Sequence, residues 1–311
     1  EGDLSGTECQ PGTIYRKPKS GRREVESGPM KNIEAAANAV QRMDAHLRTA
    51  LLVKDGTIPP QKLWENTYIK KQIDMRKSGG TFTLKDHVRG MVYSMITSGA
   101  PWSRLEDSID MATGQIAIVD EIFFQYDIDT LKNTDPACLV DRLLAQKLGT
   151  PYSDNQMNAL VHVNIKKLPW LERTYGSIDS FYQKFIQADP SIKTLVKELS
   201  AFGKPNKFEQ LGEALTAEYL RNVGYDLAKP DRHIRRILGR DTLGCSDSQT
   251  APIYEAFDIV SEIAKTAGKC AAEVDYILWS YCAKGFGEIC TARNPKCRQC
   301  VARNICKNIG G

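Results

Sequence analysis

CTARNPKCRQCVARNIC, residues 290–306, constrains the fold and chemistry of this chain more than any other segment. Its four cysteines, Cys290, Cys297, Cys300 and Cys306, follow the spacing C-x6-C-x2-C-x5-C. Thiolates this close in sequence can surround one metal centre. Structural zinc sites usually combine two short cysteine pairs that lie well apart, whereas one x2 step between two longer loops suits an iron–sulfur cube. We therefore expect a [4Fe-4S] cluster, with zinc and four unrelated thiols as the alternatives.

The composition is that of an ordinary globular protein. The 311 residues are 41% hydrophobic and 26% charged, with a net charge of +4. No run of about 18 apolar residues is present and the N-terminus is polar, so we expect neither a membrane span nor a signal peptide. The other five cysteines are scattered and odd in number, which favours a reducing compartment over a disulfide scaffold.

Basic residues gather in two places, 229–240 and 284–307. Local basic clusters on a nearly neutral protein suit a polyanion that docks on one face. A charge run on its own more often marks a solvated surface.

Apolar residues recur at intervals of three and four along most of the chain, which predicts helices. One such pattern runs from Lys31 to Val53, and a Thr-x-x-Asp capping box at Thr83 and Asp86 starts another that reaches Ile96. Further patterns cover 105–125, 136–147, 154–165, 177–187, 191–201, 211–223, 231–239, 251–266 and 271–283. No alternating strand pattern, Asn-Gly turn or internal repeat is found, so the sequence predicts an all-α fold of short helices.

A second informative segment is LGEALTAEYLRNVGYDLAKPDRHIRRILGR, residues 211–240. Its first helix should start near Gly212 and end at Val223, with Gly224 as the C′ residue. Pro230 keeps the residue before it extended, which makes Asp231 well placed to cap the next helix. From position alone, Asp231 is a capping residue.

Together, the two segments resemble the helix-hairpin-helix DNA glycosylases of the endonuclease III superfamily. Pro230-Asp231-Arg232-His233 stands where that family carries its catalytic aspartate, and the four-cysteine loop follows at the family's distance. The resemblance covers about residues 82–306. It implies a two-lobed helix-hairpin-helix glycosylase fold with a C-terminal [4Fe-4S] loop, and Asp231 as the catalytic residue. The implied partner is double-stranded DNA that contains a damaged or modified base.

The chemistry of this family requires such a carboxylate. Hydrolysis of an N-glycosidic bond builds positive charge on the sugar, and an ionised carboxylate beneath it stabilises that charge and can orient the attacking water. The amides at a helix start favour the ionised form. Capping and catalysis by Asp231 are therefore compatible.

The sequence departs from the bifunctional members of the family, which carry a lysine just after the hairpin. Depending on the alignment, that position falls on Glu213, Ala214 or Leu215, and none of these supplies an amine. We therefore expect a monofunctional enzyme, which releases the base without efficient cleavage of the abasic strand.

The hairpin departs from the family as well. Its usual Gly-x-Gly, whose amides hold a DNA phosphate, is reduced to Gly212. Lys204 and Lys207 are expected to compensate. In relatives the cysteine loop also touches the DNA backbone, which assigns Arg293 and Lys296 to DNA binding.

Candidates for the base pocket or for the wedge that replaces a flipped base are Ser98, Trp102, Tyr152 and Gln156. Packing and capping are the competing explanations for these residues. The resemblance leaves alkylated, deaminated and hypermodified bases open as substrates.

The expected organisation has four parts. Residues 1–29 form a disordered or vector-derived tail, 30–81 form N-terminal helices that complete the cluster lobe, 82–224 form a helical barrel with a degenerate hairpin, and 225–311 carry the catalytic aspartate and the cluster. We expect a monomer in the cytoplasm, associated with the nucleoid if the source is prokaryotic. The rival hypotheses are a non-catalytic iron–sulfur DNA-binding module of the same fold and an iron–sulfur electron carrier.

Overall fold

The computed structural model describes residues 30–307, so the tail predicted at 1–29 lies outside the described residues. Within this range the regular structure is helical, and extended backbone contributes just two isolated bridges, Lys54–Thr57 and Ile109–Ile116. The prediction of an all-α fold is confirmed for this part of the chain. None of these helices is long and apolar enough to cross a membrane.

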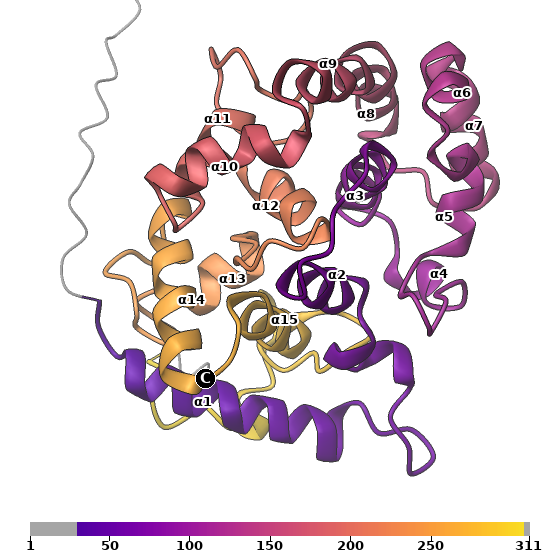
Figure 1. Ribbon diagram of the computed structural model, residues 1–311. Helices are drawn as coiled ribbons and strands as arrows, with labels where there is room; N and C mark the ends of the chain where they lie inside the picture. Colours follow the sequence, from indigo (N-terminus) through magenta and orange to yellow (C-terminus); the bar gives the residue numbers. More distant parts are fainter. Residues whose placement is uncertain (1–29, 308–311) are drawn as a thin grey trace, which may run out of the picture.

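The helices are short and follow one another closely along the chain (Figure 1). They are α1 (Ile33–His46), α2 (Tyr68–Lys77), α3 (Leu84–Ile96), α4 (Trp102–Glu106), α5 (Ala117–Ile122), α6 (Ile128–Asn133), α7 (Pro136–Ala145), α8 (Ser153–Ala159), α9 (Ile165–Tyr175), α10 (Ile178–Ala188), α11 (Lys193–Ser200), α12 (Glu213–Asn222), α13 (Arg232–Ile237), α14 (Ile253–Ala267) and α15 (Ala271–Cys282). Wider π-helical turns extend α1 over Leu47–Leu51 and join α8 to α9 over Leu160–Asn164.

Local capping chemistry explains several helix boundaries. The capping box at the start of α3 is complete, because the Thr83 side chain accepts from the Asp86 amide and the Asp86 side chain accepts from the Thr83 amide. Helix α12 starts directly after Gly212 and is followed by Gly224, whose φ of 84° is the left-handed conformation that glycine tolerates. These three predictions are confirmed.

One helix prediction is wrong, and three helices were not predicted. The pattern at 105–125 is interrupted by a turn in which the amide of Thr113 donates to Asp110 and Gly114 takes a φ of 72°, so the region contains α4 and α5 instead of one helix. Helices α2, α6 and α9 were not predicted. Most residues of α2 are polar, and its own Arg76 anchors it to the end of α12, because Arg76 Nε donates to Val223 O at 2.8 Å.

The helices form two groups around one continuous core. In Figure 1, α3 and α6–α12 lie in the upper half, α1, α14 and α15 lie in the lower half, and α2 and α13 lie between them. Gly90 favours close packing of α3 on α12, since a Cβ there would lie 3.1 Å from Val223 Cγ1, closer than most such contacts. Helix α1 packs along α14 and α15 and so joins the C-terminal group.

Candidate active site

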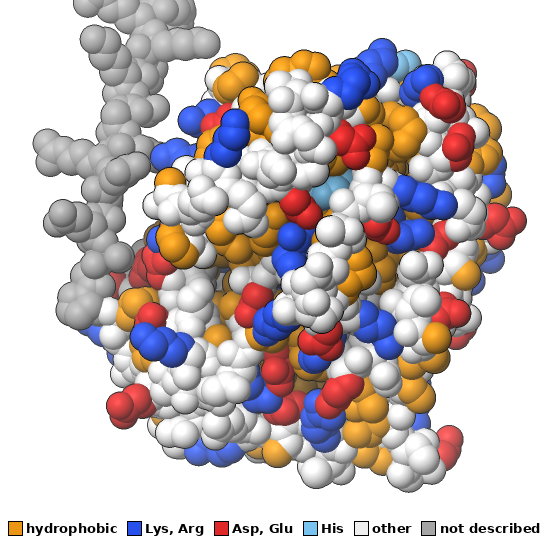
Figure 2. Space-filling model, viewed as in Figure 1, with side chains coloured by type: hydrophobic (Ala, Val, Ile, Leu, Met, Phe, Trp, Pro, Cys, Tyr) orange, Lys and Arg blue, Asp and Glu red, His pale blue; other side chains and the backbone are white. Residues whose placement is uncertain are grey.

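A cleft of about 1230 Å³ opens where the two groups of helices meet. Its wall includes the segment before α2, the end of α3 and the loop after it, the start of α12, the turn at 229–231 and one face of α15. On the face of the molecule that Figure 2 draws, acidic and basic side chains lie close together over the middle. The cleft is therefore large, mixed in charge and built from segments far apart in sequence.

Asp231 lies in the wall of this cleft and caps α13. Its Oδ1 accepts from the amides of His233 at 2.7 Å and Ile234 at 3.1 Å, so the predicted cap is confirmed. No described hydrogen bond uses the second oxygen, Oδ2. One oxygen is therefore fixed by two helix amides, while the other has no described hydrogen-bond partner.

The turn that precedes Asp231 is tight. The Asp231 amide donates to Lys229 O at 2.6 Å, across Pro230, which has no amide hydrogen of its own. The Lys229 amide points the other way and donates to Asp275 Oδ1 at 2.8 Å. Asp275 thus ties the turn to α15.

A buried ionic cluster surrounds this anchor. Asp275 and Arg221 are 2% and 5% exposed, and Arg221 Nη1 donates to Asp275 Oδ2. Arg221 Nη2 also lies 2.9 Å from Glu218 Oε2, and Lys229 Nζ lies 3.7 Å from the same oxygen. Burial raises the pKa of Asp275 to about 6, although Arg221 and the Lys229 amide favour its ionised form.

For Glu218, the nearby positive charges have a larger effect on the pKa than burial has. Its burial alone would raise the pKa, but Arg221 and Lys229 outweigh that effect and hold the pKa of Glu218 below its usual value. Sequence reasoning missed this cluster of Arg221, Glu218 and Asp275. One signal was present, because Asp275 lies in the middle of the otherwise largely apolar stretch AAEVDYILWSYC.

The start of α12 also borders the cleft. Gly212 lines it together with Glu213, Ala214 and Leu215, which are the three positions considered for a nucleophilic lysine. Gly212 has no side chain to cap the helix, and a Cβ added there would meet nothing within 4 Å. The first amides of α12 therefore have no side-chain cap from Gly212.

The two hairpin lysines lie in the loop between α11 and α12, and neither lines the cleft. Lys204 Nζ lies 3.2 Å from Glu198 Oε2, and Lys207 Nζ lies 2.9 Å from Glu209 Oε2. Each is therefore already paired with an acid near it in sequence.

The pocket candidates separate into two groups. Ser98, Trp102 and Tyr152 line the cleft, whereas Gln156 is buried beside it and its Nε2 lies 3.4 Å from Met95 O. Tyr152 is 60% exposed. Trp102 packs edge-on against Trp279, with ring centres 6.3 Å apart, so it is half-buried in the wall. The structure brings three of the four candidates to the same cleft as Asp231.

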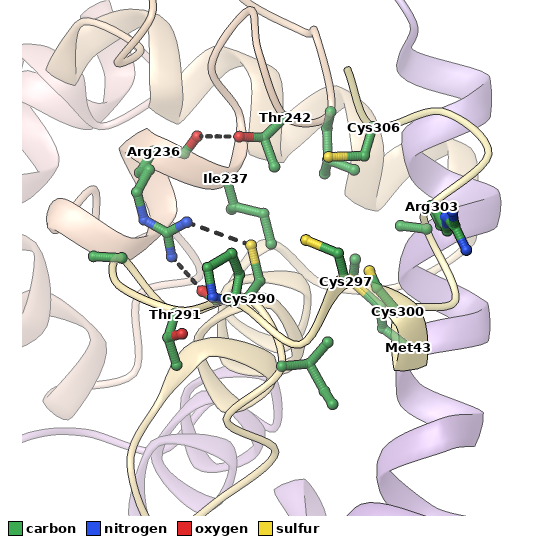
Figure 3. A pocket seen from close by; sticks show the side chains of 15 residues that line it. Met43, Arg236, Ile237, Thr242, Cys290, Thr291, Cys297, Cys300, Arg303 and Cys306 are labelled. Carbon is green, nitrogen blue, oxygen red and sulfur yellow. Dashed lines mark hydrogen bonds between the residues drawn. The ribbon is translucent and has the colours of Figure 1, made fainter. Parts of the chain in front are cut away.

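The four cysteines of 290–306 line a second cavity, of about 210 Å³ (Figure 3). Met43 of α1 and Arg236 and Ile237 of α13 also line the cavity. No group of three or more His, Cys, Asp or Glu side chains in residues 30–307 is placed to hold a single metal ion. The cysteines are distributed around a space instead of converging on one point.

Arg236 connects this cavity to the helix that Asp231 starts. Its Nη1 lies 3.4 Å from Cys290 Sγ and its Nη2 donates to Cys290 O. A hydrogen bond from the buried Cys282, assisted by Arg236, lowers the pKa of the Cys290 thiol to about 6. The six-residue helix α13 therefore has the cleft at its first turn and the cysteine cavity at its last.

Arg293 and Lys296 lie in the loop between the first two cysteines. Arg293 is exposed, and its carbonyl oxygen accepts from Thr291 Oγ1 at 2.7 Å. Lys296 Nζ lies 4.0 Å from Glu288 Oε2. Both are on the surface of the cysteine loop.

Comparisons with known proteins add little. No protein-family model matches the chain, and no curated protein is significantly similar to it. Among solved structures, the chain is similar to the 8-oxoguanine glycosylase/lyase of Methanocaldococcus jannaschii in complex with a 15mer DNA containing 8-oxoguanine. The identity is 19% over 68% of this chain and 87% of the other, with a TM-score of 0.42. A likeness of this size carries no conclusion about fold or activity.

Proposed function

We propose that this protein is a DNA glycosylase that flips a damaged or modified base from double-stranded DNA and hydrolyses its N-glycosidic bond. The observation that carries the proposal is the placement of Asp231, a half-buried carboxylate at a helix start in the wall of the large cleft. The Pro-Asp-x-His motif and the cysteine loop, in the order found in the endonuclease III superfamily, support the same activity and the corresponding two-lobed fold.

In the proposed reaction, Asp231 acts on the sugar. As the bond to the base lengthens, the sugar gains positive charge, and the ionised carboxylate stabilises it. The amides of His233 and Ile234 hold Oδ1 in place, which leaves Oδ2 to orient or deprotonate the attacking water. A cleft of this size has room for an extruded nucleotide.

We further propose that the enzyme is monofunctional. Strand cleavage by this superfamily needs an amine that attacks the sugar. The residues at the start of α12 carry none. Lys229 and Lys284 line the cleft elsewhere, and the amine of Lys229, two residues before Asp231, lies 3.7 Å from the Glu218 carboxylate. An ammonium group stabilised by a carboxylate is a poor nucleophile.

For the cysteine cavity we propose a [4Fe-4S] cluster held by Cys290, Cys297, Cys300 and Cys306. The cavity fits the donor set of such a group, because four thiols line a space of about 210 Å³. The cluster would supply structural order to the loop that carries Arg293 and Lys296.

A screen for released bases tests the activity. The protein is incubated with duplexes that carry single alkylated, deaminated, oxidised or hypermodified bases, free bases are identified by mass spectrometry, and strand breaks are measured with and without alkali. We expect one class of base to be released, with breaks that depend on alkali, and no release by Asp231→Asn.

The outcomes separate the candidates. Breaks before alkali treatment would contradict the monofunctional proposal. Tight duplex binding without release of any base would favour the non-catalytic iron–sulfur binding module. Iron and sulfide analysis of the purified protein, with about four irons expected per chain, tests the cofactor independently.

A further inference from the structure

The backbone before Asp231 has few ways to be held in place. Pro230 has no amide hydrogen, and the amide of Asp231 is used within the turn. The remaining backbone donor of the turn is the Lys229 amide, which donates to Asp275 Oδ1 at 2.8 Å. Among the described backbone amides of residues 229–231, that of Lys229 alone donates to another helix, and the Lys229 side chain adds an ion pair with Glu218 of α12 at 3.7 Å.

Asp275 is itself rigidly held. It is 2% exposed on α15, and its other oxygen accepts from Arg221 on α12. Arg221 is also buried and lies 2.9 Å from Glu218 of its own helix. A buried carboxylate with both oxygens occupied has little freedom to move, and it fixes whatever backbone it binds.

We propose that Asp275 is a positioning residue: its carboxylate, clamped by Arg221, holds the Lys229–Asp231 turn so that Asp231 points its second oxygen into the cleft. The inference rests on the proposed function, since it assigns Asp275 a role in presenting the catalytic carboxylate. Small displacements of such a group have large effects on rate, because a shift of about 1 Å can cost about a hundredfold.

The experiment compares binding of two abasic duplexes that need no knowledge of the excised base. One carries a neutral tetrahydrofuran and the other a cationic pyrrolidine at the same position. A correctly placed Asp231 carboxylate favours the cation. The ratio of the two dissociation constants therefore reports the position of Asp231, and it is insensitive to a general loss of folded protein.

Two substitutions at Asp275 weaken the clamp to different degrees. Asp275→Ala removes the acceptor and should lower the preference for the cation about tenfold or more. Asp275→Asn keeps one acceptor oxygen for the Lys229 amide but turns an amide donor toward Arg221, so the clamp is weakened and the preference should fall by an intermediate amount. If Asp275→Ala does not fold, the Asn variant still tests the proposal, because an unchanged preference there would contradict a positioning role.

Asp226 provides a matched control. It ties the chain just before the turn to the same helix, since its Oδ1 accepts from the Ala272 amide at 2.9 Å, and no described hydrogen bond joins its side chain to residues 229–231. Asp226→Ala should therefore leave the ratio unchanged. An equal loss in Asp226→Ala and Asp275→Ala, or an unchanged ratio in folded Asp275→Ala, would overturn the inference. No preference in the unsubstituted protein would instead count against the proposed function.

Discussion

Two helices start at the edge of the same cleft with nearly the same backbone and opposite chemistry. Gly212, before α12, has φ −77° and ψ −179°, and Asp231, before α13, has φ −75° and ψ −179°. Gly212 gives α12 no side-chain cap, whereas the Asp231 carboxylate accepts hydrogen bonds from two amides of α13. One start is suited to receive an anion and the other to stabilise a cation.

This difference suggests a division of labour in the cleft. The α12 start would hold a phosphate of the DNA backbone, and the α13 start would face the sugar whose bond breaks. A capping carboxylate at both starts would occupy the amides of α12 that are proposed to hold a phosphate, and glycine at both would leave no capping carboxylate for catalysis. The two residues therefore explain the proposed activity only as a pair.

The largest effect is expected when the α13 start loses its charge. Asp231→Asn keeps an acceptor oxygen for the two amides but is neutral, so the single-turnover rate of base release should fall by about 10³-fold while duplex binding stays the same. Asp231→Ala should lose the rate and also about 1 kcal/mol of unfolding free energy, because the cap is gone. Rates and urea unfolding of both variants check this, and a fully active Asn variant would be incompatible with the proposed role.

The next largest effect concerns Asp275, which holds the turn before α13, and the dependence of the protein's stability on pH. Burial raises the pKa of Asp275 from 3.8 to about 6, so between these values the folded protein binds a proton that the unfolded chain has released. Stability is therefore lost as the pH rises through this window, and replacement by Asn removes the loss. The unfolding free energy of the unsubstituted protein, relative to Asp275→Asn, should fall by about 2 kcal/mol between about pH 4.5 and 7.5. Parallel pH curves for the two proteins would contradict this.

Replacing Gly212 by Asp makes the start of α12 resemble that of α13, and it tests whether the amides of α12 bind a DNA phosphate. Gly212→Asp adds a carboxylate where we expect a phosphate, so the duplex dissociation constant should rise about tenfold, while the helix gains a cap. Gly212→Ala is the control, because its Cβ meets nothing within 4 Å and its backbone suits any residue. If both variants bind DNA as the unsubstituted protein does, the amides of α12 are not the phosphate site.

The smallest effect is expected from the hairpin lysines. Lys204 and Lys207 already pair with Glu198 and Glu209, so releasing them to a phosphate breaks an existing ion pair. Their joint replacement by alanine should weaken duplex binding no more than about threefold. The slope of the logarithm of the binding constant against the logarithm of the salt concentration should fall in magnitude by less than the loss of two phosphate contacts would cause. A slope reduced by about two would show that side chains, and not the amides of α12, hold the DNA.

Local chemistry explains what the sequence could predict. Capping at Thr83 and Asp231 and the glycine after α12 depend on neighbouring residues, and all three were predicted correctly. Helix α2 was missed because a distant partner, through Arg76 and Val223, holds a mostly polar segment. The pattern at 105–125 looked helical because periodicity does not register the turn at Gly114.

The candidate site shows the same limit. Asp231 and the four cysteines were found because each belongs to a short motif with a characteristic spacing. Asp275 was missed because its partners meet it only after folding. Arg221 lies 54 residues away in the sequence, and the Lys229 amide lies 46 residues away. Contacts of this kind depend on how α12, α13 and α15 pack, which no local pattern encodes.

The central claim is that a negative charge at Asp231 faces the sugar, and one binding comparison tests it most directly. Dissociation constants are measured for the cationic pyrrolidine and neutral tetrahydrofuran duplexes with the unsubstituted protein and with Asp231→Asn. We predict that the unsubstituted protein prefers the cation by about tenfold or more and that the Asn variant has no preference. Equal binding of the two duplexes by the unsubstituted protein, or a preference that survives in Asp231→Asn, would contradict the claim.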